Sequence, residues 1–262
     1  MFKKIMLVSA LLNVFLLTAC GEMGEDPIEK PVNEGTPIQE PADNDDIAEE
    51  EIPDDEEQPP IQPDEILDPN NLVILANKEY SIGEHVPGDL KTVEVPTVLE
   101  NPEIRQLKEP AADALKEMFD AAEEEGIILH ARSGYRSYQT QVQLFNSNVE
   151  KHGEEAASQF SSRPGHSEHQ TGLAMDVTSE SVNYQLVEAF GETEEGIWLQ
   201  ENAHLFGFII RYPEGKSDIT GYVYEPWHLR YLGNDLATLV YESGLSYEEF
   251  LYEWGIISEI NK

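Results

Sequence analysis

The sequence predicts an α+β fold, with a single compact domain over residues 70–262 in which a small, mainly antiparallel sheet is flanked by helices. Two observations predict this class. The region contains both apolar residues at helical spacing and short apolar runs typical of strands. These segments do not alternate regularly, as they would in a doubly wound parallel sheet. The region is also long enough to bury one substantial core.

The first elements follow from local patterns. Leu72–Leu75 is an apolar run that predicts an opening strand. Pro110 begins a helix, because apolar residues then recur every three or four positions, and Gly126 ends it. Ile127–Ala131 is a candidate for a buried strand. The apolar positions of this helix are Ala111, Ala114, Leu115, Met118, Phe119 and Ala122.

The second half of the domain begins with a helix over residues 137–151, for which Ser137 is the expected N-cap. A polar loop with two glycines follows and leads into a strand. We expect the remaining elements to be a helix, a strand, an aromatic extended segment and two short closing helices. The loop is Ser161–Gly172, the first strand Leu173–Val177, the helix Gly196–Phe206, the next strand Phe208–Arg211 and the extended segment Gly221–Tyr231.

The N-terminus has the features of an export signal. Two lysines precede the apolar run Ile5–Leu17, which is short for the roughly 20 residues of a membrane-spanning helix. The sequence Leu-Thr-Ala-Cys that ends at Cys20 resembles the lipobox of bacterial lipoproteins. This resemblance implies a signal peptide over residues 1–19, cleavage before Cys20, and diacylglycerol on its sulfur. The expected location is the outer face of the cell membrane.

Residues 20–69 are expected to form a disordered tether. Between residues 21 and 68 there are 19 Asp and Glu against one Lys, eight prolines and no aromatic residue. Such a composition cannot bury enough apolar surface to offset the loss of chain entropy. The domain that follows is also acidic, which argues against nucleic-acid partners. We expect a monomer.

Two separated motifs predict a metal-dependent hydrolase. The stretch Ser167–Asp176 supplies one candidate imidazole ligand, His169, and one candidate carboxylate ligand, Asp176. The sequence Glu-Pro-Trp-His that ends at His228 adds a second imidazole and, in Glu225, a candidate base. Three protein ligands and an open position are typical of catalytic zinc sites. We therefore expect one zinc ion per chain, in a cleft of the domain.

Both motifs need an irregular backbone to work. His169 and Asp176 are seven residues apart, too far to share an ion on one helix. Gly172 lies between them and predicts a fold-back into the following strand. On a regular strand Glu225 and His228 would point to opposite sides. A bulge or turn at Pro226 would bring them to one side.

The motifs together resemble those of the LAS metallopeptidases, in particular the VanY-like D-alanyl-D-alanine carboxypeptidases that trim peptidoglycan stem peptides. An upstream sequence, Ser-Gly-Tyr-Arg-Ser over residues 133–137, also matches that family, and the resemblance covers roughly residues 70–255. It implies that Glu225 takes a proton from the attacking water and that Arg136 stabilises the developing oxyanion. The implied zinc ligands are His169, Asp176 and His228, and the implied lining of the terminal D-amino-acid subsite is Gln141, Ser167, Trp227 and Tyr212.

The resulting hypothesis is an extracytoplasmic zinc carboxypeptidase that removes the C-terminal D-alanine from stem peptides, with the D-Ala-D-Ala bond favoured. One alternative is an L,D-carboxypeptidase acting on tetrapeptides. A non-catalytic zinc-containing wall-binding module and an endopeptidase are the others. A pure binder would need neither Glu225 nor Arg136.

Overall fold

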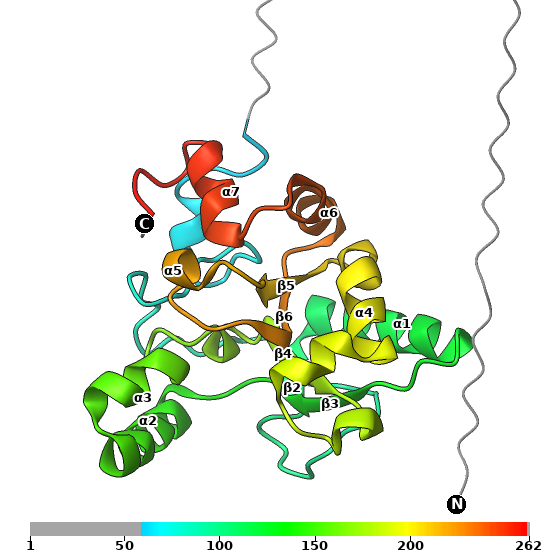
Figure 1. The fold of residues 1–262 in the computed structure, drawn as a ribbon. Coiled ribbons are helices and arrows are strands. Elements are labelled where there is room, and N and C mark those ends of the chain that lie inside the picture. Colours follow the sequence, from blue (N-terminus) through cyan, green and yellow to red (C-terminus); the bar gives the residue numbers. More distant parts are fainter. Residues whose placement is uncertain (1–58, 261–262) are drawn as a thin grey trace, which may run out of the picture. The chain divides into compact units, whose positions relative to one another are not determined.

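The computed structural model describes residues 59–260, all of which belong to one compact unit (Figure 1). The predicted signal peptide, Cys20 and the tether as far as residue 58 lie outside the described residues. None of the helices within 59–260 is long and apolar enough to cross a membrane.

The centre of the fold is a four-stranded antiparallel sheet in the order β3-β4-β6-β5. A second, two-stranded antiparallel sheet pairs β1 with β2. Together with the surrounding helices, these sheets confirm the predicted α+β class. The strands are β1 (Leu90–Thr92), β2 (Gln106–Lys108), β3 (His130–Ser133), β4 (Ala174–Thr178), β5 (Phe208–Tyr212) and β6 (Glu225–Tyr231).

The longer helices agree with the sequence patterns. The Ser137 hydroxyl accepts a hydrogen bond from the Thr140 N–H and caps α2, as predicted. In Figure 1, α2 and α3 lie at one side of the sheet, apart from α1 and α4. The α-helices are α1 (Glu109–Glu124), α2 (Tyr138–His152), α3 (Glu154–Phe160), α4 (Glu194–Asn202), α5 (Ser217–Thr220), α6 (Asn234–Ser243) and α7 (Tyr247–Glu253). The 3-10 helices are η1 (Glu65–Leu67), η2 (Glu168–Thr171), η3 (Glu180–Val182), η4 (Glu188–Glu192) and η5 (Ala203–Phe206).

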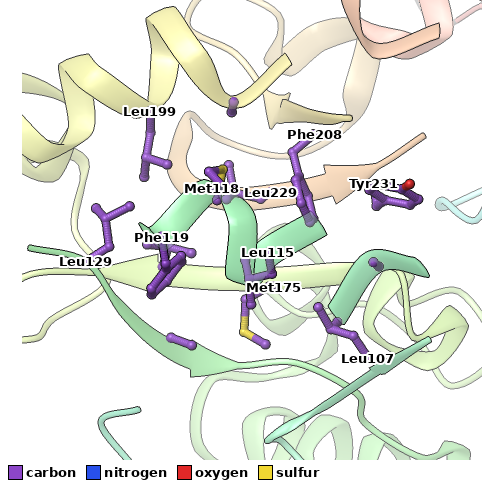
Figure 2. Close-up of a cluster of buried hydrophobic side chains, with 14 of the residues drawn as sticks. Leu107, Leu115, Met118, Phe119, Leu129, Met175, Leu199, Phe208, Leu229 and Tyr231 are labelled. Atoms are coloured by element: carbon purple, nitrogen blue, oxygen red, sulfur yellow. The ribbon is translucent and has the colours of Figure 1, made fainter. Parts of the chain in front are cut away.

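One face of the four-stranded sheet packs against α1 and α4 to form the main core (Figure 2). Met175 of β4 and Leu229 of β6 are cross-strand partners and meet Leu115 and Met118 of α1 there. Since side chains alternate along a strand, their neighbours Asp176 and His228 face the opposite side. The apolar face of the sheet therefore anchors the strands, and the other face is available for polar groups.

A second apolar cluster joins the C-terminal helices to the beginning of the described chain. Ile61 and Ile66 are buried in it beside Tyr247, Phe250 and Leu251 of α7. The predicted boundary between tether and domain at residue 70 is therefore too late, because Ile61 and Ile66 already belong to the packed domain.

The predicted strand at Leu72–Leu75 is wrong. The segment is largely buried but irregular, because its carbonyl groups bond to side chains instead of to a neighbouring strand. Arg230 donates to the Leu72 and Ile74 carbonyls, and the Tyr247 hydroxyl donates to that of Val73. An apolar run indicates burial, but it does not show which groups form hydrogen bonds with the backbone N–H and carbonyl groups.

Candidate active site

His169, Asp176 and His228 come together on the polar side of the sheet, as the sequence predicts. One potential ligand atom from each lies within 4.8 Å of those from the other two, and all three residues are buried. His169 Nε2 is 3.5 Å from Asp176 Oδ2, and His228 Nδ1 is 3.0 Å from Asp176 Oδ1. Tetrahedral zinc with bonds of about 2.0–2.1 Å separates its ligand atoms by roughly 3.3 Å. The two histidine–aspartate distances lie close to this value, so the three side chains form a candidate zinc site.

The fold-back between His169 and Asp176 occurs at Gly172. His169 lies in η2, and Gly172 follows with φ +71°, a left-handed conformation that favours glycine. A Cβ atom at this position would also come within 2.9 Å of the Leu90 side chain. The chain then enters β4, where Asp176 points back toward His169. This confirms the predicted turn and explains why a glycine is needed there.

An irregularity in β6 places Glu225 on the same side as His228. The pairing of β6 with β5 shifts register between the pairs Ile210–Leu229 and Tyr212–Glu225. Three residues of β6, with Pro226 the first, therefore lie opposite one residue of β5. Such an inserted stretch re-aims side chains. Glu225 Oε2 is consequently 3.9 Å from His228 Nδ1, and the predicted bulge is confirmed.

The orientation of each imidazole is set by the nitrogen that does not face Asp176. His169 Nδ1 lies 2.9 Å from the Gly134 carbonyl oxygen and donates to it, which leaves Nε2 toward Asp176. His228 is turned the other way, with Nδ1 toward Asp176 and Nε2 3.3 Å from Glu168 Oε2. These tautomers are assigned from the hydrogen-bond partners. His169 therefore directs Nε2, and His228 directs Nδ1, toward the Asp176 carboxylate.

The electrostatics of the two histidines differ. Burial lowers the pKa of His169 to about 3, so its neutral form is favoured. Burial also acts to lower the pKa of His228, but its hydrogen bonds to Asp176 and Glu168 outweigh this and raise the pKa to about 9 in the metal-free protein. The carboxylates of Asp176 and Glu168 therefore favour a positive charge on His228 when no metal is bound.

Glu225 has the properties of a general base. Burial raises the pKa of its carboxyl group to about 7, and the negative charges of Asp176 and Glu168 act in the same direction. A carboxylate poised near neutrality takes up and releases protons effectively. Its side chain is only 15% exposed and borders the cleft beside His228.

Arg136 enters the same cleft from the loop between β3 and α2. Its Nη1 donates to Gln141 Oε1 at 2.9 Å, and its Nη2 lies 3.3 Å from Ser133 Oγ. Burial lowers its pKa from the usual value, although Asp176, Glu103 and Glu225 oppose the change. The guanidinium is therefore held in a fixed orientation beside the metal-ligand cluster.

Gln141 has a different position from that implied by the resemblance. It is fully buried, its Oε1 accepts from Arg136, and its Nε2 donates to the Ser162 carbonyl at 2.6 Å. Both ends of the amide are engaged within the protein, and Gln141 is not part of the cleft lining. In the structure Gln141 fixes the Arg136 guanidinium through this hydrogen bond and does not face the cleft.

The cleft has a volume of about 350 Å³. Ser167, Trp227 and Tyr212 line it, where the resemblance predicts a subsite, and Leu144 of α2 and Phe160 of α3 form an apolar wall. Tyr222 also lines the cleft and was not predicted; its hydroxyl lies 2.7 Å from Ser162 Oγ. The cleft combines a catalytic cluster with room for the end of a peptide.

Sequence reasoning missed Glu168 altogether. This residue is fully buried between His228 and two arginines, Arg211 and Arg230. Burial acts to raise its pKa, but the two guanidinium groups prevail and hold the pKa far below the usual value. The sequence offers one signal: Glu168 is a charged residue inside the first motif, and Arg211 and Arg230 lie in segments that are otherwise apolar.

Comparison with known proteins agrees with this geometry. Residues 104–234 match the family described as VanY, D-alanyl-D-alanine carboxypeptidase. The chain is 49% identical over 187 residues to YodJ of Bacillus subtilis (strain 168), a protein provisionally named a carboxypeptidase; the match spans 71% of this chain and 68% of YodJ.

Two solved structures share the fold. The LD-carboxypeptidase LdcB is 49% identical, with a TM-score of 0.68, over 70% of this chain and 86% of LdcB. A mutant of the D,D-pentapeptidase VanY from a VanB-type vancomycin resistance cassette, solved in complex with Zn(II), is 34% identical with a TM-score of 0.57. That match covers 68% of this chain and 97% of the VanY chain.

Proposed function

Because the chain belongs to the VanY family of D-alanyl-D-alanine carboxypeptidases, we propose that it is a zinc-dependent carboxypeptidase that removes the C-terminal D-alanine from peptidoglycan stem peptides. The observation that carries this proposal is the convergence of the His169, Asp176 and His228 cluster with Glu225 in one cleft. Three ligands leave one position of a tetrahedral ion open to water or substrate. The Zn(II) in the VanY structure supports the choice of metal.

His169 Nε2, an oxygen of Asp176 and His228 Nδ1 would hold the zinc ion. When bound, zinc supplies a Lewis acid that polarises a carbonyl group and acidifies water. The Gly134 carbonyl contacts His169 Nδ1 and Glu168 contacts His228 Nε2, and these two contacts keep the imidazoles in place to receive it.

Glu225 performs the proton transfers. Its carboxylate accepts a proton from the water that attacks the scissile carbonyl carbon, and it later donates that proton to the nitrogen of the leaving D-alanine. In the metal-free protein burial raises the pKa of this carboxyl group to about 7, so the group is able to hold a proton near neutral pH.

Arg136 binds the carbonyl oxygen as negative charge develops on it. The contacts to Gln141 and Ser133 fix the guanidinium before substrate arrives, so little reorganisation is needed during the reaction. A wall-binding module without activity has no use for a fixed cation and a carboxylate base in the same cleft. The pair therefore favours hydrolysis over binding alone.

The scissile bond has two candidates. The family description names D-Ala-D-Ala, the bond that the sequence also favours. The 49% identity to LdcB, described as an LD-carboxypeptidase, supports instead the bond between the third residue and the D-alanine of a tetrapeptide. The match to the D,D-pentapeptidase is weaker, at 34% identity. We therefore place the L,D bond beside the D,D bond as a second candidate activity.

We also propose that the enzyme is a monomer anchored on the outer face of the cell membrane through lipid on Cys20. The basic start, the apolar run and the cysteine after Leu-Thr-Ala support this location. Two acyl chains give stable anchoring, and the acidic, proline-rich residues that follow suit an extended tether toward the cell wall.

Defined pentapeptide and tetrapeptide muropeptides test the proposal directly. After incubation with the zinc-loaded protein, mass spectrometry should detect the loss of one alanine from at least one of them. Loss from the pentapeptide alone identifies the D,D activity, and loss from the tetrapeptide identifies the L,D activity. Cleavage further inside the stem indicates an endopeptidase, and no cleavage of either substrate contradicts the proposed function.

A further inference from the structure

Glu168 is a buried carboxylate that contacts a proposed metal ligand and two arginines at once. Its Oε2 lies 3.3 Å from His228 Nε2, on the side of the imidazole that faces away from Asp176. Its Oε1 accepts from Arg211 Nε at 2.7 Å and from Arg230 Nη1 at 2.8 Å. One oxygen therefore serves the histidine, and the other binds the arginines.

The arginines are themselves held by groups from distant parts of the chain. Arg211 forms a two-pronged pair with Glu248 of α7, with N–O distances of 2.7 and 2.5 Å. Arg230 donates to the Leu72 and Ile74 carbonyls at 2.9 and 2.6 Å. Glu248 Oε1 also accepts from Asn77 Nδ2 at 3.1 Å.

This network is fully desolvated. The side chains of Glu168, Arg211 and Arg230 are 0% exposed, and that of Glu248 is 5% exposed. Burying ionic groups in this way is costly, and apolar residues of similar volume often serve stability equally well. An arrangement that places two carboxylates and two guanidinium groups under a metal-ligand cluster therefore calls for a role beyond packing.

We propose that Glu168 is a positioning residue for His228: it accepts the Nε2 proton of His228 and thereby presents Nδ1 to the metal, while Arg211 and Arg230 fix the Glu168 carboxylate. This inference rests on the proposed function, because it concerns zinc at the same site. Imidazole donates through one ring nitrogen and coordinates through the other, so the partner of Nε2 determines which atom is free to bind. His169 is positioned independently, through the Gly134 carbonyl.

The geometry separates this role from that of an ordinary buried ion pair. A carboxylate that only neutralised the arginines would direct both oxygens toward them. Instead, Glu168 directs Oε2 toward His228 Nε2. The other nearby carboxylate, Asp176, faces Nδ1 of the same ring. Glu248 provides the comparison: it pairs with Arg211 from the opposite side and does not touch either histidine.

The test measures zinc affinity, by competition with a chromophoric chelator, in metal-free wild-type protein and in Glu168→Gln. An amide has one acceptor oxygen and cannot serve the arginines and His228 together. We expect zinc binding to weaken by about 10- to 100-fold, as for other outer partners of metal-ligating histidines. Glu248→Gln is the matched control, because it removes a carboxylate from the same network without touching His228 and should bind zinc nearly as tightly as wild type.

Equal zinc affinity of wild type and folded Glu168→Gln overturns the inference, and so does an equal loss in both variants, which would indicate general disruption. A wild type that binds no zinc overturns the proposed function itself. Should Glu168→Gln fail to fold, nitrogen-15 histidine NMR of the zinc-loaded wild type gives the answer. A protonated Nε2 on His228 supports the inference, and a protonated Nδ1 overturns it.

Discussion

Asp176 of β4 and His228 of β6 are direct cross-strand partners, and Asp176 Oδ1 lies 3.0 Å from His228 Nδ1. Residues opposite each other on one face of an antiparallel pair bring their side chains together. Two of the three proposed zinc ligands, 52 residues apart in the chain, are thus placed by the register of the sheet. Moving that register by one residue would turn one ligand into the apolar core.

Glu225→Gln should retain zinc and lose turnover. The amide preserves the size of the side chain but cannot accept the proton from the attacking water. We expect kcat to fall by about 10²- to 10⁴-fold, the range for loss of a general base. Glu201→Gln, an exposed change on α4, is the control and should keep full activity. Wild-type turnover in Glu225→Gln would eliminate it as the base.

Arg136→Lys should lower kcat more than it changes KM, because the guanidinium acts on charge that develops in the transition state. A lysine ammonium cannot bond to Gln141 and Ser133 in the same planar geometry. The expected loss in kcat is about 10²- to 10³-fold, as for an oxyanion-hole donor. Steady-state kinetics with Arg105→Lys as the control check this. A rise in KM at constant kcat would assign Arg136 to ground-state binding only.

The backbone irregularities of the site were predictable because glycine and proline mark them. Gly172 tolerates the left-handed conformation that returns the chain to β4, and Pro226 cannot continue a regular ladder. The helix patterns were equally informative, since the apolar spacing after Pro110 and the Ser137 cap correspond to α1 and α2. The predicted strand at 127–131 begins later, as β3 at His130.

The features that the sequence did not predict depend mainly on contacts between segments that are distant in the chain. Glu168 and its arginines stand out locally only as charged residues in apolar surroundings, and the ion pairs between them are recognisable only when the partners are known. The run Leu72–Leu75 resembles a strand but is satisfied by side chains more than 150 residues away. The short helix α3 has little periodic pattern in seven residues and was not predicted.

The metal-free protein should lose stability as the pH rises from 7 to 9. The pKa of His228 is about 9 in the fold against an ordinary value of 6.5. A raised histidine pKa contributes stability that is fully present below 6.5 and is lost as the pH rises through 9. Glu225, with its pKa raised from 4.5 to about 7, adds a loss of the same sign, but most of that loss occurs below this range, as the pH rises from 4.5 to about 7.

Chemical denaturation of chelator-treated protein across this range measures the effect. His228→Gln should lack the decline above pH 7, whereas the exposed change His152→Gln should retain it. Zinc-loaded protein should also lack it, because a metal ligand must already be deprotonated. An unchanged slope in His228→Gln would contradict the assignment.

Cys20→Ala should release the protein from the membrane. If lipid on Cys20 is the anchor, its removal leaves no acyl chains to bury in the bilayer. Cell fractionation should then move the protein from the membrane to the medium, while zinc content and activity stay at the wild-type level. Ser9→Ala, in the preceding apolar run, is a suitable control. Continued membrane association of Cys20→Ala would refute the lipid anchor.

Zinc-dependent catalysis is tested most directly by titrating zinc into the metal-free protein while measuring the D-alanine released from a stem-peptide substrate. The cluster of His169, Asp176 and His228 provides one site per chain, so release should be absent without metal and rise linearly until one equivalent of zinc is bound. D-alanine release that persists in the metal-free protein, or that zinc does not restore, would contradict the proposed zinc carboxypeptidase.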